Sequence, residues 1–336
     1  MFKSFIRGNN AAKFIRKRRE NLKVLVTGAA GFIGSYVVQA LLEKEISVVA
    51  VDNLSTGKLT NLTENVPFYK IDITDKALEN VFQTESPDYV IHLAAQSSVI
   101  ESMINPVEDC QSNILGTLNI LRFAKQYGVK KCVVASTAAV YGNPTIFPVG
   151  EDSKLSPLSF YALSKLSAEN YILLYEKLFN LSSTILRFSN VYGPKQPNGV
   201  ITSLIECLVE GETPIIYDGN QTRDFIYVKD IAQACIQSML SKQTGIFNIS
   251  SNRELSIKQL YKEITDAMGV HTEPVYEILR DGEIERSVLS NVKAIASLGW
   301  TPTYHLEGGL RETIGHYVYQ KTLKQDCVPS SQSINS

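Results

Sequence analysis

The first half of the chain alternates short apolar runs with amphipathic stretches. Residues 22–27 read Leu-Lys-Val-Leu-Val-Thr, a β-branched run that ends at a glycine-rich turn. Phe32 to Lys44 then carry apolar residues at helical spacing. A short apolar run predicts a strand, and helical spacing predicts a helix that packs on it. The chain therefore opens with strand, turn and helix.

The same alternation continues to about residue 188. Further strands are predicted at Ser47–Asp52, Val66–Asp72, Tyr89–Leu93, Lys131–Ala135 and Ser183–Phe188, and helices at Asn113–Tyr127 and Tyr161–Phe179. Alternating strands and helices predict the α/β class, with a Rossmann-type, doubly wound parallel sheet.

From Asn190 the chain becomes rich in Gly, Pro and Asn, and the strict alternation stops. We predict a large first domain, with later segments returning to it, and a smaller C-terminal α/β lobe. The predicted limits are 1–21 for a basic extension, 22–189 for the first domain, 190–324 for the lobe and 325–336 for a polar tail. In the lobe, helices are predicted near Thr202–Glu210, Val228–Leu240 and Ile257–Met268.

Composition narrows the class of partner. Of the 336 residues 44% are hydrophobic and 20% charged, and the net charge is -1, so no bulk field favours nucleic acid. No apolar run reaches about 18 residues, so no integral membrane segment is expected. Five scattered cysteines without a C-x-x-C pair fit a reduced, cytoplasmic compartment. Four histidines without ligand spacing predict no metal.

The first 21 residues are the one strongly biased segment. They hold seven basic residues against Glu20 alone, without the apolar centre of a secretory signal. A solvated helix or arm is the favoured interpretation, and contact with a membrane surface or an acidic partner is the alternative.

The turn after the first strand predicts a dinucleotide site. Gly28, Gly31 and Gly34 form G-x-x-G-x-x-G, where backbone amides and the start of a helix can meet a pyrophosphate. Asp52 ends the next strand and is placed to accept hydrogen bonds from both ribose hydroxyls, which favours NAD over NADP. The alternative for Asp52 is an ordinary residue at the end of a strand. Further cofactor contacts are predicted at Asn53, Ser55, Gly57, Asp72, Ile73, Leu93, Ala94 and Ala95.

Tyr161 and Lys165 lie four residues apart in a segment that begins Ser156-Pro157, a plausible helix start capped by Ser156. Four residues place both side chains on one helix face. An ammonium and an oxidised nicotinamide both favour the phenolate, so Tyr161 is predicted to act as a base. Thr137, after the strand that ends at Ala135, is predicted to bind the reacting sugar oxygen. The alternative for the pair is a surface tyrosine and a solvated lysine.

Five segments together resemble one family. They are Thr27-Gly-Ala-Ala-Gly-Phe-Ile-Gly34, Val51-Asp-Asn-Leu-Ser-Thr-Gly57, Ser136-Thr-Ala-Ala-Val-Tyr-Gly142, Tyr161-Ala-Leu-Ser-Lys165 and Asn190-Val-Tyr-Gly-Pro194. They are similar to the extended short-chain dehydrogenases/reductases that act on nucleotide sugars, most of all the UDP-glucose and UDP-N-acetylglucosamine 4-epimerases. The resemblance runs from about Leu22 to Tyr317.

The resemblance implies an isomerase with tightly held, recycled NAD and a UDP-sugar substrate. Tyr161 would take the proton of the 4-hydroxyl while hydride passes to NAD, giving a 4-keto sugar that turns over and is reduced on its other face. Related dehydratases carry an Asp-Glu pair after the active-site threonine, whereas this chain has Ala138 and Ala139. Simple withdrawal and return of hydride is therefore the favoured chemistry.

The resemblance also assigns residues. Arg223 and Arg280 match the family's diphosphate-binding arginines, and Asn190 matches an asparagine near the pyrophosphate and sugar; the alternatives are surface ion pairs and a turn. Ser287, a small residue beside the sugar's 2-substituent, leaves room for an N-acetyl group, so UDP-GlcNAc and UDP-GalNAc are the predicted substrates, alongside UDP-Glc and UDP-Gal. Further contacts carry over to Phe32, Ile33, Thr56, Ser97, Ser112 and Ser189 for the cofactor and to Ser98 and Glu283 for the substrate.

Two of these positions depart from the family pattern: Ser97 replaces a lysine found in some epimerases, and Ser189 replaces an aromatic residue. The family usually dimerises through two helices, here Val107–Tyr127 and Tyr161–Phe179, which predicts a homodimer. The alternatives are a nucleotide-sugar dehydratase, decarboxylase or reductase on the same scaffold, and a non-catalytic NAD-sensing protein.

Overall fold

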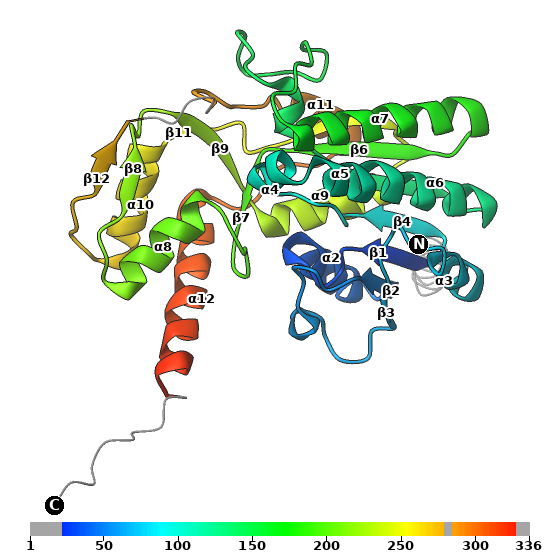
Figure 1. Ribbon diagram of the computed structural model, residues 1–336, viewed down its shortest axis with the longest axis horizontal. Coiled ribbons are helices and arrows are strands. Elements are labelled where there is room, and N and C mark those ends of the chain that lie inside the picture. The colour runs from blue at the N-terminus through cyan, green and yellow to red at the C-terminus, as the bar shows by residue number, and fades with distance from the viewer. Residues whose placement is uncertain (1–21, 279–283, 327–336) are drawn as a thin grey trace, which may run out of the picture.

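The computed structural model describes residues 22–278 and 284–326. Its larger part is a seven-stranded parallel sheet with the strand order β10-β6-β5-β4-β1-β2-β3 (Figure 1). The strands are β1 (Lys23–Thr27), β2 (Ser47–Asp52), β3 (Phe68–Lys70), β4 (Tyr89–His92), β5 (Lys131–Thr137), β6 (Ser183–Phe188) and β10 (Gly245–Ile249). The predicted Rossmann-type, doubly wound sheet is confirmed.

Helices cover both faces of this sheet. One face carries α2 (Phe32–Leu42), α9 (Val228–Leu240) and α11 (Val292–Leu298), and the other carries α3 (Leu78–Glu85), α6 (Gly116–Gln126) and α7 (Phe160–Phe179). Along β1, Val24 and Val26 belong to the first core and Leu25 to the second. Successive side chains of a strand point to opposite faces, so a strand that is covered on both sides is apolar throughout.

The smaller lobe has a core of its own. It contains α8 (Val200–Glu210), α10 (Ile257–Met268), α12 (Leu306–Asp326), a sheet of β7 (Asn190–Tyr192), β9 (Thr222–Tyr227) and β11 (Glu254–Ser256), and the pair β8 (Ile215–Tyr217) and β12 (Val275–Glu277). Leu204, Leu260 and Leu310 are buried together where the three helices meet. This lobe lies at the left of Figure 1, beside the carboxyl end of the large sheet.

The chain returns to the large sheet after leaving it. β10 pairs with β6 as an edge strand, and α9 and α11 pack on the same sheet although both follow Asn190. Domain limits near residue 190 stay a prediction.

The helix predicted at Asn113–Tyr127 begins as a π-helical turn. The predicted helix from Asn113 is preceded by α4 (Val99–Ile104) and α5 (Pro106–Cys110) and begins as a π-helical turn, η2 (Gln111–Leu115), before α6. Two 3₁₀ turns, η1 (Leu59–Asn61) and η3 (Ala138–Tyr141), lie in loops. π-Helical turns often mark functional sites because they redirect side chains.

Two local predictions were wrong. The cap of α7 is Ser159, whose hydroxyl accepts from Ala162 N at 3.1 Å, and not Ser156. The backbone of Ser156 instead donates to Val140 O, so Pro157 lies outside the helix. Strand β5 also runs past Ala135 to Thr137, because Thr137 still pairs with Phe188 of β6.

Within residues 22–278 and 284–326, no helix is long and apolar enough to cross a membrane.

Candidate active site

The loop between β1 and α2 has no space for side chains at two of its glycines. Gly28 has a φ of +66°, and a Cβ there would lie 2.7 Å from Ala94 N. A Cβ at Gly34 would lie 1.9 Å from the carbonyl oxygen of Gly28. Gly31 caps α2 without a side chain, so the helix amino terminus stays open. Backbone amides and the helix dipole can therefore meet an anionic group here.

Asp52 lies beside this loop, at the end of β2. Its Oδ2 accepts from Ala30 N at 2.9 Å and its Oδ1 from Leu54 N at 2.7 Å, and the residue is only 7% exposed. A carboxylate oxygen accepts about two hydrogen bonds, so each oxygen can still receive a ligand hydroxyl. The predicted ribose contact is compatible with this geometry.

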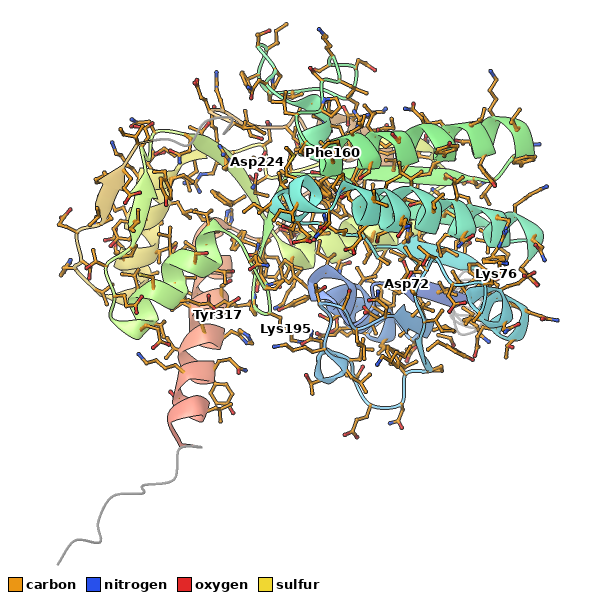
Figure 2. The ribbon with its side chains drawn as sticks, viewed as in Figure 1. Asp72, Lys76, Phe160, Lys195, Asp224 and Tyr317 are labelled. Carbon is orange, nitrogen blue, oxygen red and sulfur yellow. The ribbon has the colours of Figure 1, made fainter. Side chains whose placement is uncertain are left out.

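The loops after β2 and β3 are tied together. Asn53 Nδ2 donates to Asp72 Oδ2 at 2.7 Å, and Asn53 Oδ1 accepts from Ser55 N at 2.9 Å. Burial would raise the pKa of Asp72, but hydrogen bonds from Thr74 and Asn53 outweigh it and hold that pKa below its usual value. Asp72 therefore stays ionised. It lies on the side of the large sheet (Figure 2). Thr56 is exposed and Gly57 half-buried in the same loop.

A buried histidine supports the opposite side of the cofactor loop. His92 Nδ1 lies 2.7 Å from Thr27 Oγ1, and its Nε2 lies 3.1 Å from Thr117 Oγ1. Thr27 Oγ1 also accepts from the amides of Leu93 and Ala94, at 3.2 and 3.3 Å. Burial, followed by the charge of Lys165, lowers the pKa of His92 to about 3. The imidazole is therefore neutral and links β1 to β4.

The predicted catalytic side chains come together at the carboxyl ends of β5 and β4. Thr137 is the last residue of β5, and Tyr161 lies in the first turn of α7, where it is half-buried. A hydrogen bond from Thr137 reaches the Tyr161 hydroxyl. Lys165 follows one turn later and is 5% exposed. The alternative of a surface tyrosine and a solvated lysine does not fit this burial.

Burial opposes ionisation of both groups. It raises the pKa of Tyr161 to about 12, despite the Thr137 hydrogen bond, and the charge of Asp109 adds to the rise. It lowers the pKa of Lys165 to about 8, against the charges of Glu169 and Asp109. Burial therefore opposes the phenolate, whereas the hydrogen bond from Thr137 favours it. The predicted role of Tyr161 as a base stays a prediction, in which the positive charge of an oxidised nicotinamide would also favour the phenolate.

An ion pair lies behind these residues. Arg187 donates to Glu169 through Nε at 2.9 Å and Nη2 at 2.6 Å, and both side chains are at most 2% exposed. Ser136 Oγ also donates to Glu169, at 2.5 Å. Because Ser136 precedes Thr137, the pair joins α7 and β6 to the end of β5 that carries Thr137.

Asn113 connects α7 to the loop after β4. Its Nδ2 contacts Ser164 Oγ at 3.0 Å and Gln96 O at 2.9 Å, and its Oδ1 accepts from Gln96 N at 2.9 Å. Ser164 Oγ donates in turn to the carbonyl oxygen of Tyr161 at 3.0 Å. The π-helical turn η2 places Asn113 at this junction.

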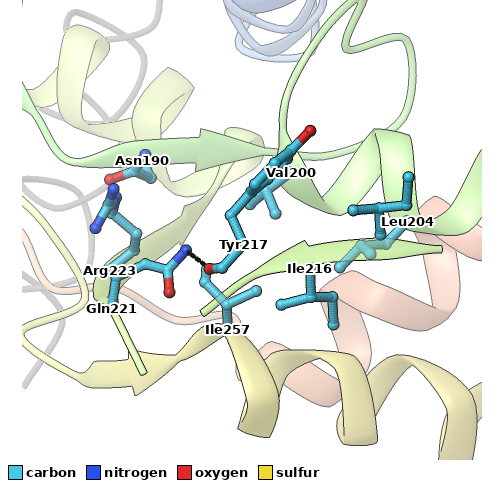
Figure 3. A pocket seen from close by; sticks show the side chains of 9 residues that line it. Asn190, Val200, Leu204, Ile216, Tyr217, Gln221, Arg223 and Ile257 are labelled. Carbon is cyan, nitrogen blue, oxygen red and sulfur yellow. Dashed lines mark hydrogen bonds between the residues drawn. The ribbon is translucent and has the colours of Figure 1, made fainter. Parts of the chain in front are cut away.

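A cavity of about 230 Å³ opens in the smaller lobe (Figure 3). Asn190 and Arg223, both predicted from the sequence, lie together on its wall. Gln221 Nε2 donates to Tyr217 O at 2.7 Å and fixes the adjacent backbone. The remaining wall is mainly apolar, from Val200, Leu204, Ile215, Ile216 and Ile257. The cavity therefore brings the Arg223 guanidinium next to apolar side chains.

Asp224, next to Arg223, joins the two parts of the molecule (Figure 2). It is fully buried and accepts from Ser251 N at 2.9 Å, Ser251 Oγ at 2.7 Å and Leu289 N at 3.3 Å. Ser189 Oγ donates to it at 3.4 Å, so this hydroxyl serves a packing contact. A cofactor contact of Ser189 stays a prediction.

Other predicted contacts lie in several places. Ser98 caps α4 by accepting from Glu101 N at 3.1 Å, Ser97 precedes it, and Ser112 is half-buried in η2. Phe32 and Ile33 begin α2, Ile73 follows Asp72 and is buried, and Ala95 continues the loop after Ala94. Ser287 is half-buried beside Val288. Arg280 and Glu283 lie outside the described residues.

Within the described ranges, no group of three or more His, Cys, Asp or Glu side chains is placed to hold a metal ion.

Known proteins resemble the chain over most of its length. Residues 24–250 match the NAD dependent epimerase/dehydratase family. The chain belongs to this family. A UDP-glucose 4-epimerase of Mycolicibacterium smegmatis is 37% identical over 305 residues, covering 87% of this chain and 97% of the relative. Three predictions are confirmed: the family, the assignment as an enzyme of the epimerase group, and NAD as the cofactor.

Solved structures of this epimerase family agree. UDP-glucose 4-epimerase of Thermotoga maritima, solved with UDP-glucose, has a TM-score of 0.87 and 40% identity, and the match covers 90% of this chain and 100% of that one. UDP-N-acetylglucosamine 4-epimerase of Methanobrevibacter ruminantium, solved with UDP-N-acetylmuramic acid, has a TM-score of 0.86 and 36% identity, covering 89% and 99%.

The residues of this family member fit NAD. A Cβ at Gly28 or Gly34 would collide with backbone, which keeps the loop close to the helix amino terminus where a diphosphate would bind. Lys165 carries its ammonium on a side chain that is only 5% exposed, one turn from Tyr161. Such a group needs a partner, and ribose hydroxyls one turn from Tyr161 would supply it.

Five polar residues behind the site were not predicted from the sequence: His92, Asp109, Asn113, Glu169 and Arg187. Some signal existed, since Glu169 follows Lys165 by one turn and Arg187 is a charge within an otherwise apolar strand. A charge at a buried strand position needs a partner, and that expectation points to a network.

Proposed function

We propose that the protein catalyses NAD-dependent 4-epimerisation of a UDP-hexose through a transient 4-keto sugar. The observation that carries the proposal is the meeting of Thr137, Tyr161 and Lys165 at the carboxyl end of the sheet, beside a glycine loop that fits NAD. Relatives named as UDP-sugar 4-epimerases match nearly the whole described chain.

Each residue has a defined part in this proposal. Bound NAD would supply the acceptor and donor of hydride for carbon 4 of the sugar and, when oxidised, a positive charge. Tyr161 accepts the proton of the 4-hydroxyl and later gives it back. Thr137 orients the reacting oxygen through its hydroxyl. Lys165 holds the ribose, and its ammonium favours the phenolate of Tyr161.

The smaller lobe is the proposed UDP site. The Arg223 guanidinium suits a diphosphate, since its fork matches phosphate oxygens. Asn190 lies beside it, and the apolar wall of the cavity suits a flat base. Arg280 and Glu283 stay proposed contacts from the sequence. The two lobes thus bind opposite ends of the substrate and cofactor.

The proposed substrates are UDP-GlcNAc and UDP-GalNAc, with UDP-Glc and UDP-Gal also accepted. The support is Ser287, whose side chain is small at the position that the family places beside the 2-substituent. A bulky residue there would exclude an N-acetyl group. Ser287→Tyr is therefore expected to reduce kcat/KM for the N-acetylated pair more than for UDP-Glc and UDP-Gal.

The test is direct. Purified protein is incubated with each of the four UDP-sugars, and the products are separated by chromatography. We expect interconversion of 4-epimers to an equilibrium mixture, without net production of NADH. Loss of water or carbon dioxide, or accumulation of NADH, would instead show a dehydratase, decarboxylase or reductase. Bound NAD without any sugar turnover would show a sensing protein.

A homodimer is part of the proposal. α4 and α5 pack against α7, and an apolar face is exposed across these helices. Its members are Ile100, Met103, Ile104, Val107, Leu163, Leu174 and Leu178. Exposed apolar residues on neighbouring helices often mark an interface, and a second copy of the chain would cover these.

A further inference from the structure

Asp109 is a buried carboxylate to which the mechanism above gives no part. It lies in α5, is 1% exposed, and accepts through Oδ1 from Gln96 Nε2 at 3.2 Å and Asn113 Nδ2 at 3.1 Å. Its Oδ2 is buried and finds no hydrogen-bond partner among the described residues. A buried charge without compensation is costly, so the site needs an explanation.

Lys165 is the cationic group whose charge acts on Asp109. α5 packs against α7, and Asn113 bridges Asp109 to Ser164, the residue before Lys165, at 3.1 and 3.0 Å. The charge of Asp109 acts on both Lys165 and Tyr161. Lys165 and Asp109 are thus two buried groups of opposite charge, and Asp109 has hydrogen-bonding capacity to spare.

A second carboxylate, that of Glu169, also favours the ammonium of Lys165, and its effect is larger than that of Asp109. Two hydrogen bonds from Arg187 hold Glu169 in place. Burial raises the pKa of Asp109, while a hydrogen bond with Ser164 and the charge of Lys165 oppose that rise. Asp109 and Lys165 are therefore buried groups of opposite charge that act on each other across the contact of α5 with α7.

On the other elements around Lys165, no described group takes the place of Asp109. β4 presents His92, which is neutral, and β6 presents Arg187, which is paired. On α4, Glu101 accepts a hydrogen bond from Asn105. On α6, the Arg122 guanidinium lies 4.4 Å from the ring centroid of Phe123. The Lys125 ammonium lies 4.3 Å from the ring centroid of Phe179. The charged end of β5, Lys131, donates to the carbonyls of Ser238, Ser241 and Gln243.

We propose that Asp109 is a positioning residue for the proposed epimerase reaction: its carboxylate adds to that of Glu169 in favouring the ammonium of Lys165, and its hydrogen bonds hold the loop after β4 against α7. The inference rests on the proposed function. The negative charge of Asp109 stabilises the ammonium of Lys165 and destabilises the phenolate of Tyr161. Removing it therefore makes the ammonium less favourable and the phenolate more favourable. Both groups then titrate at lower pH.

The test compares Asp109→Asn with Glu108→Gln. Both remove one negative charge from α5, but Glu108 is exposed. In the holoenzyme, activity requires the phenolate of Tyr161, which sets the acid limb, and the ammonium of Lys165, which sets the alkaline limb. Asp109→Asn is expected to move both limbs of the kcat profile to lower pH by about one unit or more, the usual size for a close charge. Glu108→Gln is expected to leave both limbs in place.

A second readout does not depend on turnover. The ultraviolet absorbance of tyrosinate, corrected with Tyr161→Phe, follows ionisation of Tyr161 directly. Asp109→Asn is expected to lower the pH at which this signal appears. If the wild-type chain epimerises no sugar, the proposed function fails, but this titration still decides whether Asp109 acts on Tyr161.

Retained charge provides the rescue variant. Asp109→Glu keeps the carboxylate, so we expect a lower kcat with both limbs at their wild-type pH; this variant also decides the question if Asp109→Asn does not fold. A reduced kcat with unmoved limbs in Asp109→Asn would show a purely structural residue and overturn the proposal. Equal shifts in Glu108→Gln, or shifted limbs in Asp109→Glu, would overturn it as well.

Discussion

Tyr161 and Lys165 lie one turn apart on α7, and burial disfavours the charged form of each side chain. Burial raises the pKa of Tyr161 to about 12 and lowers that of Lys165 to about 8. The base and the ammonium are both disfavoured by the same low dielectric, so each needs a charged neighbour. An enzyme that ionises Tyr161 only beside a bound, oxidised cofactor would be protected from idle proton transfer.

Replacing Tyr161 tests the base. Tyr161→Phe keeps the ring and its packing but removes the hydroxyl that takes the sugar proton. We expect kcat to fall by roughly 100- to 10,000-fold, the usual contribution of general acid–base catalysis, with NAD still bound. NAD released on denaturation gives the second measurement. Near-normal turnover would remove Tyr161 from its role.

Gly34 tests the closeness of the cofactor loop. A Cβ there would lie 1.9 Å from the carbonyl oxygen of Gly28, which is backbone and cannot rotate away. Gly34→Ala is therefore expected to lose NAD and to lower the free energy of unfolding by about 1–3 kcal/mol. Gly150→Ala is the control, because its Cβ would meet nothing within 4 Å. NAD content and urea unfolding are the measurements.

At the scale of elements, the start of α7 decides where Tyr161 lies. The sequence offers two serines before the helix, and either can cap it by residue type alone. The structure selects Ser159, because the backbone of Ser156 is already bonded to Val140 at the end of η3. A shift of the helix start by three residues would place Tyr161 one turn further into the helix.

The two serines give a paired prediction. Ser159→Ala removes the hydrogen bond to Ala162 N and is expected to lower the free energy of unfolding by about 1 kcal/mol. Ser156→Ala is expected to change it by less than about 0.5 kcal/mol, as at other positions without a special contact. Chemical denaturation of both variants is the measurement; equal losses would contradict the assignment of the cap.

At the scale of the whole molecule, the large sheet and the smaller lobe meet at Asp224, and the apolar face of α4, α5 and α7 is left exposed. In these helices, the buried side carries Asp109 and Lys165 and the exposed side carries the apolar face. Association through this face would therefore support the helices that hold the proposed catalytic residues.

The double variant Val107→Glu, Leu174→Glu tests the proposed dimer. Two charges per protomer on the apolar face would be buried unpaired in the interface, so we expect monomers in sedimentation velocity. Ile146→Glu is the control: Ile146 is 77% exposed but lies outside that face, and this variant is expected to stay dimeric. A wild-type monomer would refute the dimer.

The sequence by itself determined the sheet, because hydrophobic pattern fixes its strands and helices. Local spacing also predicted the glycine loop, Asp52 and the trio of Thr137, Tyr161 and Lys165, whose roles stay predictions. Only the tertiary structure revealed Ser159 as the cap, the pairing of Glu169 with Arg187 and the bridge from Asp109 through Asn113 to α7. The pairing and the bridge depend on burial and on contacts between residues 18 to more than 50 positions apart. The choice of cap depends on the bond between Ser156 and Val140. Local sequence pattern does not encode contacts between distant residues. The pKa of a buried group therefore follows only from the structure, because its neighbours in space set it.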